Sequence, residues 1–353
     1  MAFEAIDPQG RARPLLLGAR LGRGGEAEVL REAFTTARVV KLFPDGVSSA
    51  KRRKIEAMLA RPPAGSIEAH GGRSIVQIAW PSELVVERGR GLRGFTMPAV
   101  DLAGCAPLHG LHATSARRRH RLPEDYRFRV YAARNLAAVM GHLHAAGHHM
   151  VDTKPQNVRV YRDGAFVCLL DCDGYAVAGG GERHPAAVRT IEYLAPEAFG
   201  ASPEALGEAQ DRFGLAVLIF ELLTNGVHPC AGRDPTGLLP PDTAGRLEGR
   251  RFFIDPAGDL QPPWATIWPS LPSTTRDLLT AALLGPPDAR PSSAVWLGHL
   301  DGLVAALETC PVDPDHSHLG GACPWCALRG RKRPDLPPRA APAVKSQRSA
   351  GSR

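Results

Sequence analysis

Residues 150–157, Met-Val-Asp-Thr-Lys-Pro-Gln-Asn, bring three different polar groups together within a few positions of the chain. Asp152 offers a carboxylate, Lys154 an ammonium group and Asn157 a carboxamide. The apolar run that follows ends at a second carboxylate, Asp171. One carboxylate to orient a hydroxyl, one cation for a phosphate, and an amide with a second carboxylate for a metal ion are the groups that phosphoryl transfer needs. The stretch therefore predicts a phosphoryl-transfer site.

The composition is that of a globular protein whose charge is unevenly distributed. The chain has 353 residues, 44% of them hydrophobic, which is enough for one large two-lobed domain or two ordinary ones. Its net charge of +7 arises in residues 327–353, where eight Lys and Arg residues accompany a single acid, Asp335. The basic run at residues 117–121 has no interleaved aromatic residues, so we expect a solvated loop there and no nucleic-acid binding.

The termini and the cysteines indicate the cellular compartment. No leader of charged and then apolar residues opens the chain. The longest apolar run, residues 213–223, is about half of what a bilayer requires, and it contains Glu221. We therefore expect a cytoplasmic protein without membrane attachment. Three of the seven cysteines lie near the C-terminal end, which in a reducing cytosol indicates a metal site.

A glycine-rich turn and a lysine-bearing strand lie in the N-terminal part of the chain. Residues 15–21 and 39–43 have the apolar pattern of strands, and Gly22-Arg-Gly-Gly-Glu follows the first of them. Glycine lets backbone N–H groups approach a phosphate, although the same turn also occurs in plain hairpins. Lys41 on the second strand favours the phosphate interpretation. The helix predicted at residues 48–60 contains one acid, Glu56, which either pairs with Lys41 or is solvated.

Three more motifs follow the opening stretch. They are TIEYLAPE at residues 190–197, DRFGLAV at residues 211–217 and DARPS at residues 288–292. Together with the glycine turn, the strand lysine and the opening stretch, their order resembles that of eukaryotic-type serine/threonine protein kinases over about residues 15–305. The resemblance implies that Asp211 caps the backbone of the catalytic loop and that Glu197 pairs with Arg290.

The resemblance also implies an α+β, bilobal fold. A small antiparallel-sheet lobe would be followed by a mainly helical lobe and a small zinc knuckle. The basic tail has almost no large apolar residue and should be disordered. The expected parts are a leader at residues 1–13, the N-terminal lobe at 14–98, the C-terminal lobe at 99–305, the knuckle at 306–328 and the tail at 329–353.

Each polar residue of the motifs receives a role from the resemblance. Asp152 would orient the substrate hydroxyl, and Lys154 would neutralise the transferring phosphoryl group. Asn157 and Asp171 would hold Mg²⁺. Thr190 would help to place Asp152 and Lys154, which favours serine or threonine over tyrosine as the substrate. The implied catalytic residues are Asp152, Lys154, Lys41 and Glu56, and the implied ATP-binding residues are Gly22, Gly24, Gly25, Val29, Lys41, Met97, Ala99 and Val100.

Two departures from the family pattern leave alternatives open. Met150 and Val151 replace a His-Arg pair, so the arginine that would bind a phosphorylated activation loop is missing, and we expect activity without that phosphorylation. Asp171-Cys172-Asp173 replaces Asp-Phe-Gly, and Asp173 either assists the metal or impairs the site. The alternative to an active kinase is a pseudokinase that binds nucleotide and recruits partners through the knuckle and the tail.

The C-terminal cysteines are spaced as metal ligands. Cys310, Cys323 and Cys326 offer three thiolates, and His316 lies between the first two. Sulfur and imidazole ligands with a Cys-x2-Cys pair suit tetrahedral zinc, and four protein ligands would make the site structural. His318 is the rival fourth ligand. A further hypothesis is that the zinc motif and the basic tail bind nucleic acid.

The partial match to Asp-Phe-Gly, the Gly22-Arg-Gly-Gly-Glu loop and the Ala79-Trp-Pro segment resemble an atypical bacterial branch of the kinases. Members of that branch often end in a small cysteine/histidine motif. They often accompany metal-dependent serine/threonine phosphatases and von Willebrand A-type proteins. The resemblance therefore implies such partners in addition to a protein substrate.

Overall fold

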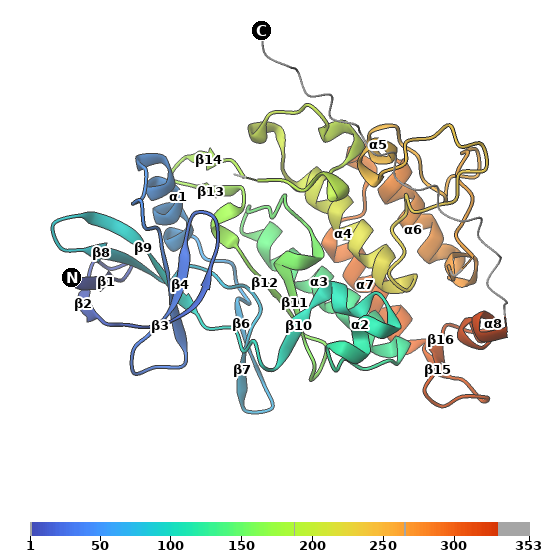
Figure 1. Cartoon of the computed structure of the whole chain (residues 1–353), viewed down its shortest axis with the longest axis horizontal. Helices are drawn as coiled ribbons and strands as arrows, with labels where there is room; N and C mark the ends of the chain where they lie inside the picture. Colours follow the sequence, from blue (N-terminus) through green and yellow to red (C-terminus); the bar gives the residue numbers. More distant parts are fainter. Residues whose placement is uncertain (1, 187, 265, 331–353) are drawn as a thin grey trace, which may run out of the picture.

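The computed structural model describes residues 2–186, 188–264 and 266–330. A curled antiparallel sheet forms the N-terminal part of the molecule, and helices form most of the C-terminal part, as Figure 1 shows. This mixed architecture agrees with the expected combination of a sheet and helices. Residues 331–353, which make up most of the predicted basic tail, lie outside the described residues.

Seven strands form the main sheet in the order β2-β1-β8-β9-β5-β4-β3. Only Leu16 separates β2 from β3, which lie at the two ends of this order, so one continuous run of chain joins the two edges and the sheet curls on itself. Ala5, Leu15, Val40 and Val85 are buried together in this part of the sheet. The strands are β1 (Phe3–Ile6), β2 (Ala12–Leu15), β3 (Leu17–Arg23), β4 (Glu28–Glu32), β5 (Arg38–Leu42), β8 (Glu83–Glu87) and β9 (Gly91–Pro98).

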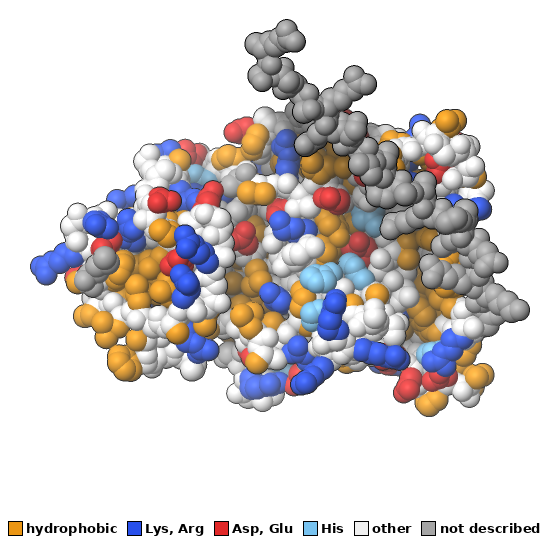
Figure 2. Space-filling model, in the orientation of Figure 1, with side chains coloured by type: hydrophobic (Ala, Val, Ile, Leu, Met, Phe, Trp, Pro, Cys, Tyr) orange, Lys and Arg blue, Asp and Glu red, His pale blue; other side chains and the backbone are white. Residues whose placement is uncertain are grey.

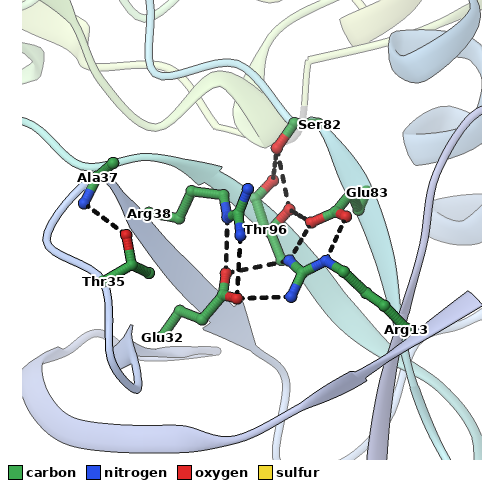
Figure 3. Close-up of polar contacts among 8 residues, drawn as sticks. All are labelled: Arg13, Glu32, Thr35, Ala37, Arg38, Ser82, Glu83 and Thr96. Atoms are coloured by element: carbon green, nitrogen blue, oxygen red, sulfur yellow. Dashed lines mark hydrogen bonds and ion pairs between the residues drawn. The ribbon is translucent and has the colours of Figure 1, made fainter.

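A network of charged side chains joins strands that are far apart in the sheet order (Figure 3). Arg13 of β2 binds Glu32 of β4 and Glu83 of β8, with N–O distances of 2.5 and 2.6 Å. Arg38 of β5 binds Glu32 at 2.8 Å, and Thr96 of β9 donates to Glu83 at 2.9 Å. Burial alone would raise the pKa of Glu32, but Arg38 and Arg13 outweigh it and lower that pKa. These ion pairs therefore stabilise the curled main sheet across several of its strands.

The N-terminal residues belong to the sheet rather than to a separate leader. β1 pairs with β8, with Phe3 opposite Glu87 and Ile6 opposite Leu84. Strands of four residues carry little sequence pattern of their own, and pairing with a strand that is distant in the chain stabilises them. The first residue outside the expected leader, Pro14, lies within β2.

The helix α1 (Ser49–Ala60) begins where the sequence predicts. The side chain of Ser48 caps it by accepting from Lys51 N, and its buried side includes Ile55 and Met58. Smaller strands lie around the helix and the sheet. These are the hairpin β6 (Ile67–His70) and β7 (Arg73–Val76), the three-stranded sheet β10 (Cys105–Pro107), β11 (Val158–Tyr161) and β12 (Val167–Leu169), and the hairpin β13 (Val177–Gly179) and β14 (Glu182–His184).

α3 (Tyr126–Ala145) and α4 (Glu208–Leu223) form the centre of the helical part. The side chain of Asp125 caps α3 by accepting from Arg127 N. α4 is apolar on nearly every side and almost wholly buried, as expected of a central helix. α3 packs against α4 and α7 (Ser293–Ala305), and α4 packs against α6 (Ser273–Leu284). No helix in the described ranges is both long enough and apolar enough to cross a bilayer.

Part of the basic run expected as a solvated loop is helical. α2 (Thr114–Arg119) contains three consecutive arginines, and the first of them, Arg117, is only 4% exposed. α5 (Thr243–Glu248) is a second short helix. The chain then forms the hairpin β15 (Glu308–Thr309) and β16 (Ser317–His318) and ends its described part in α8 (Pro324–Gly330).

Candidate active site

Asp211, in the first turn of α4, fixes the backbone just before the candidate catalytic residues. Its carboxylate accepts from the N–H of Met150 at 2.7 Å and from that of Val151 at 2.6 Å. Val151 has a φ of 61°, in the left-handed region that a β-branched residue rarely adopts. His144 Nε2 lies 2.9 Å from the same carboxylate. These contacts hold a strained conformation and confirm the capping role predicted for Asp211.

Asp152 is buried, and only one of its two carboxylate oxygens is bound. Oδ2 forms an ion pair with Lys154 Nζ at 2.8 Å and accepts from Asn157 Nδ2 at 3.0 Å. Oδ1 is buried and has no hydrogen-bond partner among the described residues. A buried carboxylate oxygen without a donor costs free energy, so it marks a position where a further donor would be stabilising. The opening stretch thus brings its three polar groups together as predicted.

The hairpin β11–β12 brings Asp171 close to Asn157. The N–H of Leu170 donates to the carbonyl oxygen of Asn157 at 2.8 Å, one position before Asp171. Asp171 has a φ of 60° and a ψ of 36°, a second left-handed conformation at a residue that is not glycine. Asn157 and Asp171 both line a cavity of about 340 Å³ between the main sheet and this hairpin. Their oxygens are ligands of the kind that Mg²⁺ prefers.

Lys41 of β5 lines the same cavity and binds two carboxylates. Its Nζ lies 2.8 Å from Asp171 Oδ1 and 2.5 Å from Asp173 Oδ1. Burial alone would lower the pKa of Lys41, but Asp173 and Asp171 outweigh burial and raise it, so the ammonium group stays charged. The side chain of Asp173 is 11% exposed and that of Asp171 is 60% exposed. Asp173 is therefore the buried partner of Lys41.

The predicted pair between Lys41 and Glu56 is not present in this structure. Glu56 lies 2.8 Å from Arg52 Nε, one turn earlier on α1, and is exposed. Lys54 is the charged residue of α1 that is buried, and its Nζ donates to the carbonyl oxygen of Pro185 at 3.1 Å. Burial lowers the pKa of Lys54 to about 8. The orientation of α1 about its own axis therefore directs Lys54 toward the protein interior and Glu56 toward solvent.

Most of the residues predicted to bind ATP line the cavity. Gly24, Gly25 and Ala99 do not, and the N–H of Ala99 donates to the carbonyl oxygen of Ala37 at 2.9 Å. Strand alternation could have identified Val39, which lies two positions before Lys41 and so on the same face. Of the residues predicted to bind ATP, the cavity is lined by Gly22, Val29, Lys41, Met97 and Val100. The apolar lining residues that were not predicted to bind ATP are Leu21, Val39, Ala79, Pro98, Leu102, Leu170 and Cys172.

Thr190 forms no hydrogen bond with the residues that it was predicted to place, Asp152 and Lys154, in the described part of the chain. Gln210 of α4 makes the connection to this segment instead. Its Oε1 accepts from the N–H of Ala195 at 2.8 Å, and its Nε2 donates to the carbonyl oxygen of Val151 at 3.4 Å. A glutamine directly before the DRFGLAV motif carried no signal of this kind.

The segment that precedes Glu197 is held by contacts that require no phosphate group. Arg183 of β14 donates to the carbonyl oxygen of Leu206 at 2.7 Å. Gly179 of β13 packs so closely on α1 that an added Cβ would lie 2.8 Å from that of Ala57. Glu197 binds Arg290 through two N–O contacts of 2.5 and 2.8 Å, which confirms the predicted pair.

The four predicted zinc ligands lie together near the C-terminal end. Cys310 Sγ and Cys326 Sγ are 3.7 Å apart, and His316 Nδ1 lies 3.6 Å from Cys323 Sγ and 3.5 Å from Cys326 Sγ. All four donor atoms lie within 4.8 Å of one another. Zinc–sulfur bonds of ~2.3 Å in a tetrahedron separate two sulfurs by about 3.8 Å, so the cluster fits a zinc site.

The structure favours His316 over His318 as the fourth ligand. His318 is buried and its Nδ1 lies 3.3 Å from the carbonyl oxygen of Gly320. His316 Nε2 lies 3.6 Å from Asp313 Oδ2, a carboxylate contact of the kind that orients a metal-bound histidine. Three cysteines and one histidine leave no coordination position open, so the donor set suits a structural metal.

Comparison with known proteins relates the whole arrangement to kinases. The chain is 31% identical over 331 residues to the protein named Protein kinase YegI of Escherichia coli strain K12, which covers 88% of this chain and 48% of the relative. The similarity supports a kinase family for this chain. The protein of the same name from Escherichia coli O157:H7 is 30% identical over 325 residues, with the same coverage. The chain spans about half the length of these curated relatives, and no family model matches it.

Proposed function

We propose that the protein is an ATP- and Mg²⁺-dependent protein kinase of bilobal fold that transfers the γ-phosphate of ATP to serine or threonine hydroxyls. The observation that supports this best is the buried Oδ1 of Asp152, which lacks a partner while Lys154 and Asn157 hold Oδ2. A substrate hydroxyl would donate to Oδ1 and direct its oxygen lone pair at the phosphorus atom. The similarity to proteins named as protein kinases supports the same class of reaction.

The cavity offers a place for each part of the nucleotide. Val29, Met97 and Val100 give it apolar surface for the adenine, and Lys41 gives it a cation for the phosphates. Asn157 and Asp171 would hold Mg²⁺, which would neutralise phosphate charge.

We further propose that Asp173 takes over the role that the family pattern gives to Glu56. Lys41 must be held in position to bind phosphates, and a buried carboxylate can do so from either side. In this structure Asp173 lies 2.5 Å from Lys41 Nζ, whereas Glu56 is turned to Arg52. Asp171 is the more exposed of the two acids beside Lys41 and so the better placed to bind a metal ion. The triplet Asp171-Cys-Asp would then be a working substitute and not a defect.

Phosphate transfer and nucleotide binding, measured separately, test the proposal. Mg²⁺-dependent transfer of labelled phosphate from ATP to protein hydroxyls should fall about 10²–10⁴-fold in Asp152→Asn. Binding of ATP, followed by thermal shift, should be unchanged in that variant. Asp163→Asn is a matched control, because Asp163 is an exposed acid in the turn of the nearby hairpin and lies outside the cavity wall.

The outcomes separate the proposal from its alternative. ATP binding by the wild-type chain without any transfer would indicate a pseudokinase. Transfer that survives Asp152→Asn would contradict the role assigned to Asp152. Phosphorylated tyrosine as the product would contradict the serine/threonine specificity.

The zinc site would be structural, since its four ligands leave no position for a substrate. The partners implied by the family resemblance, a metal-dependent phosphatase and a von Willebrand A-type protein, remain predictions. Activity without phosphorylation of the segment before Glu197 also remains a prediction, and complete phosphatase treatment should leave turnover unchanged.

A further inference from the structure

A second cavity, of about 780 Å³, lies where the Cys/His motif meets the helical part. Its wall comes from α2, the start of α3, the turn after α4, Trp264, the β15–β16 loop with the proposed zinc ligand His316, and α8. It includes none of the residues that line the candidate active-site cavity. α2 and α8 lie in the lower right of Figure 1, and blue Lys and Arg side chains gather along the lower edge of Figure 2, from the β6–β7 hairpin to α2. The volume is in the range of small-molecule sites, about 300–1,000 Å³.

Arg129 lies in the wall of this cavity as a buried cation without a counter-charge. It is 2% exposed, and its guanidinium carbon lies 4.9 Å from the ring centre of Tyr126 and 4.6 Å from that of Trp325. Its Nη1 donates to Asn225 Oδ1 at 2.8 Å, and its Nε has no hydrogen-bond partner in the described part of the chain. No carboxylate oxygen of the described chain lies within 4.0 Å of it. Two rings and an amide oxygen stabilise the charge only in part.

Arg117 of α2 is a second buried arginine in the same wall. It is 4% exposed, and its Nη1 lies 3.3 Å from the same Asn225 Oδ1 that Arg129 binds. Its other bonds go to the carbonyl oxygens of Leu111 and His112 and to Thr114 Oγ1. Its Nε, like that of Arg129, is buried without a partner among the described residues. Two positive charges therefore share one neutral amide oxygen.

No acid of the wall forms an ion pair with these two arginines among the described residues, although Asp125 and Glu124 favour their charged forms from further away. The remaining arginines already form ion pairs, one acid caps a helix, and another acid is exposed. They are Arg118 with Glu124 at 2.7 Å, Arg329 with Asp313 at 2.5 Å, Asp125 as the N-cap of α3, and Asp315.

We propose that this cavity binds a small anionic ligand through a carboxylate or phosphate group placed between Arg129 and Arg117. Such a group would lie beside the two guanidinium groups and would supply the missing negative charge. Because Trp325 belongs to the Cys/His motif and packs on Arg129, the bound ligand would contact both that motif and the helical part. The site would thus make the docking of the motif sensitive to an anion.

The charge that the ligand would meet is present at neutral pH. Burial and the neighbouring Arg117 lower the pKa of Arg129 to about 9, which still leaves the guanidinium protonated in the cell. The proposal is independent of phosphoryl transfer, because the candidate active-site cavity has its own cation, Lys41, with its own two carboxylates.

The test uses the full chain in a chloride buffer. Sodium phosphate and sodium succinate are added at matched ionic strength, and thermal unfolding and calorimetric titration are recorded. At least one of the two anions should raise the unfolding temperature in a saturable manner, and which one does so identifies the group that the site prefers. If neither anion raises the unfolding temperature more than chloride does, the proposal is overturned.

Asn225→Asp is the decisive variant. It replaces the shared amide oxygen by a carboxylate oxygen in the same place, so it should pair with both arginines without disturbing the fold. The variant should unfold at a higher temperature in chloride and should bind the anion about tenfold or more weakly. Asn225 has a φ of 64°, and aspartate tolerates that conformation nearly as well as asparagine.

Two further variants complete the test. Arg134→Met is a matched control, because Arg134 lies further along α3, outside the cavity wall, and should leave the response unchanged. Lys41→Met should leave it unchanged as well. An anion response that disappears in Lys41→Met and persists in Asn225→Asp would place the anion in the candidate active site and overturn the proposal.

Discussion

Lys41 and Arg129 are both buried cations, and the two regions that contain them balance the charge in opposite ways. Lys41 has carboxylate oxygens at 2.8 and 2.5 Å, whereas Arg129 has two aromatic rings and one amide oxygen. Two carboxylates lie beside Lys41, and this excess of negative charge suits a bound metal cation. Arg129 and Arg117 form no ion pair with a carboxylate of the described residues, and this excess of positive charge suits an anion.

The comparison teaches that the sign of an unpaired buried charge indicates whether a site binds a cation or an anion, whereas the degree of burial alone does not. A buried charge left alone costs several kcal/mol, and a chain removes that cost by pairing, by titration or by binding. Lysine and the acids can also lose their charge by titration. Arginine keeps its proton at neutral pH, so pairing and binding are its remaining routes.

Removal of the metal should separate the two regions most strongly. A structural zinc contributes roughly 10 kcal/mol of apparent binding free energy to a small motif, so strong chelation should unfold the Cys/His motif. Trp325 would then leave Arg129, and both its fluorescence and the anion response should change, while ATP binding should persist. Cys326→Ser should lose zinc, and Cys105→Ser, a buried cysteine elsewhere, should retain it. A motif that stays folded after complete chelation would contradict the metal assignment.

Replacing each cation by methionine tests the charge balance directly. Lys41→Met leaves buried Asp173 without its cation and should destabilise the fold by roughly 3 kcal/mol. Arg129→Met removes a charge that has no counter-ion, so the change should stay within about 1 kcal/mol in the absence of anions. Denaturant unfolding in chloride buffer measures both. Equal losses in the two variants would mean that a group of the chain already balances Arg129.

The partner of Lys41 can be identified by its effect on the reaction. Asp173→Asn should lower kcat/KM about 10–100-fold, because Lys41 would lose its buried carboxylate. Glu56→Gln should change kcat/KM by less than about twofold, since Glu56 is exposed and paired with Arg52. Steady-state kinetics decide between them. The reverse result would show that α1 turns during catalysis and brings Glu56 to Lys41.

Glu221 of α4 is a buried acid that forms no ion pair with a Lys or Arg of the described residues, and its contribution to stability should depend on pH. Burial raises its pKa to about 8, while Tyr193, which donates to it at 3.3 Å, opposes that shift. His112 Nε2 lies 3.7 Å away, and burial lowers the pKa of that histidine to about 4, so it is neutral. Because the folded state holds the proton more tightly, this contribution to stability is present below about pH 4.5 and is lost as pH rises toward 8.

The Glu221→Gln variant isolates this dependence. The free energy of unfolding of the wild type should fall with rising pH between about 5 and 8, by at most about 1.4 kcal/mol per pH unit from this group. Glu221→Gln should flatten that slope and gain stability relative to the wild type at pH 8. An identical slope in the two proteins would mean that Glu221 is ionised in the fold.

Features that depend on local spacing could be predicted from the sequence. The helix expected at residues 48–60 is α1, Ser49–Ala60, with Ser48 as its cap. Residues 150–157 bring their polar groups together because a short turn leaves them few arrangements. The Cys/His ligands meet because a Cys-x2-Cys turn at the start of α8 faces the β15–β16 hairpin.

Features that depend on packing between distant segments could not be predicted. The choice between Glu56 and Lys54 depends on how α1 packs against β13. The link from α4 to the segment before Glu197 depends on the contacts of Gln210. Arg117 looked like one member of a solvated basic run, and only the fold buries it beside Arg129. No pattern within residues 117–121 distinguishes the buried arginine from its exposed neighbours.

The first strand of the chain has a consequence for how the N-terminus can be altered. β1 covers the hydrogen-bonding edge of β8, and Arg13 links β2 to Glu32 and Glu83. A chain that began at residue 14 would expose that edge, and open strand edges recruit strands from other molecules. Residues 1–13 therefore protect the sheet from self-association. The shortened chain should aggregate although it retains all of its candidate catalytic residues.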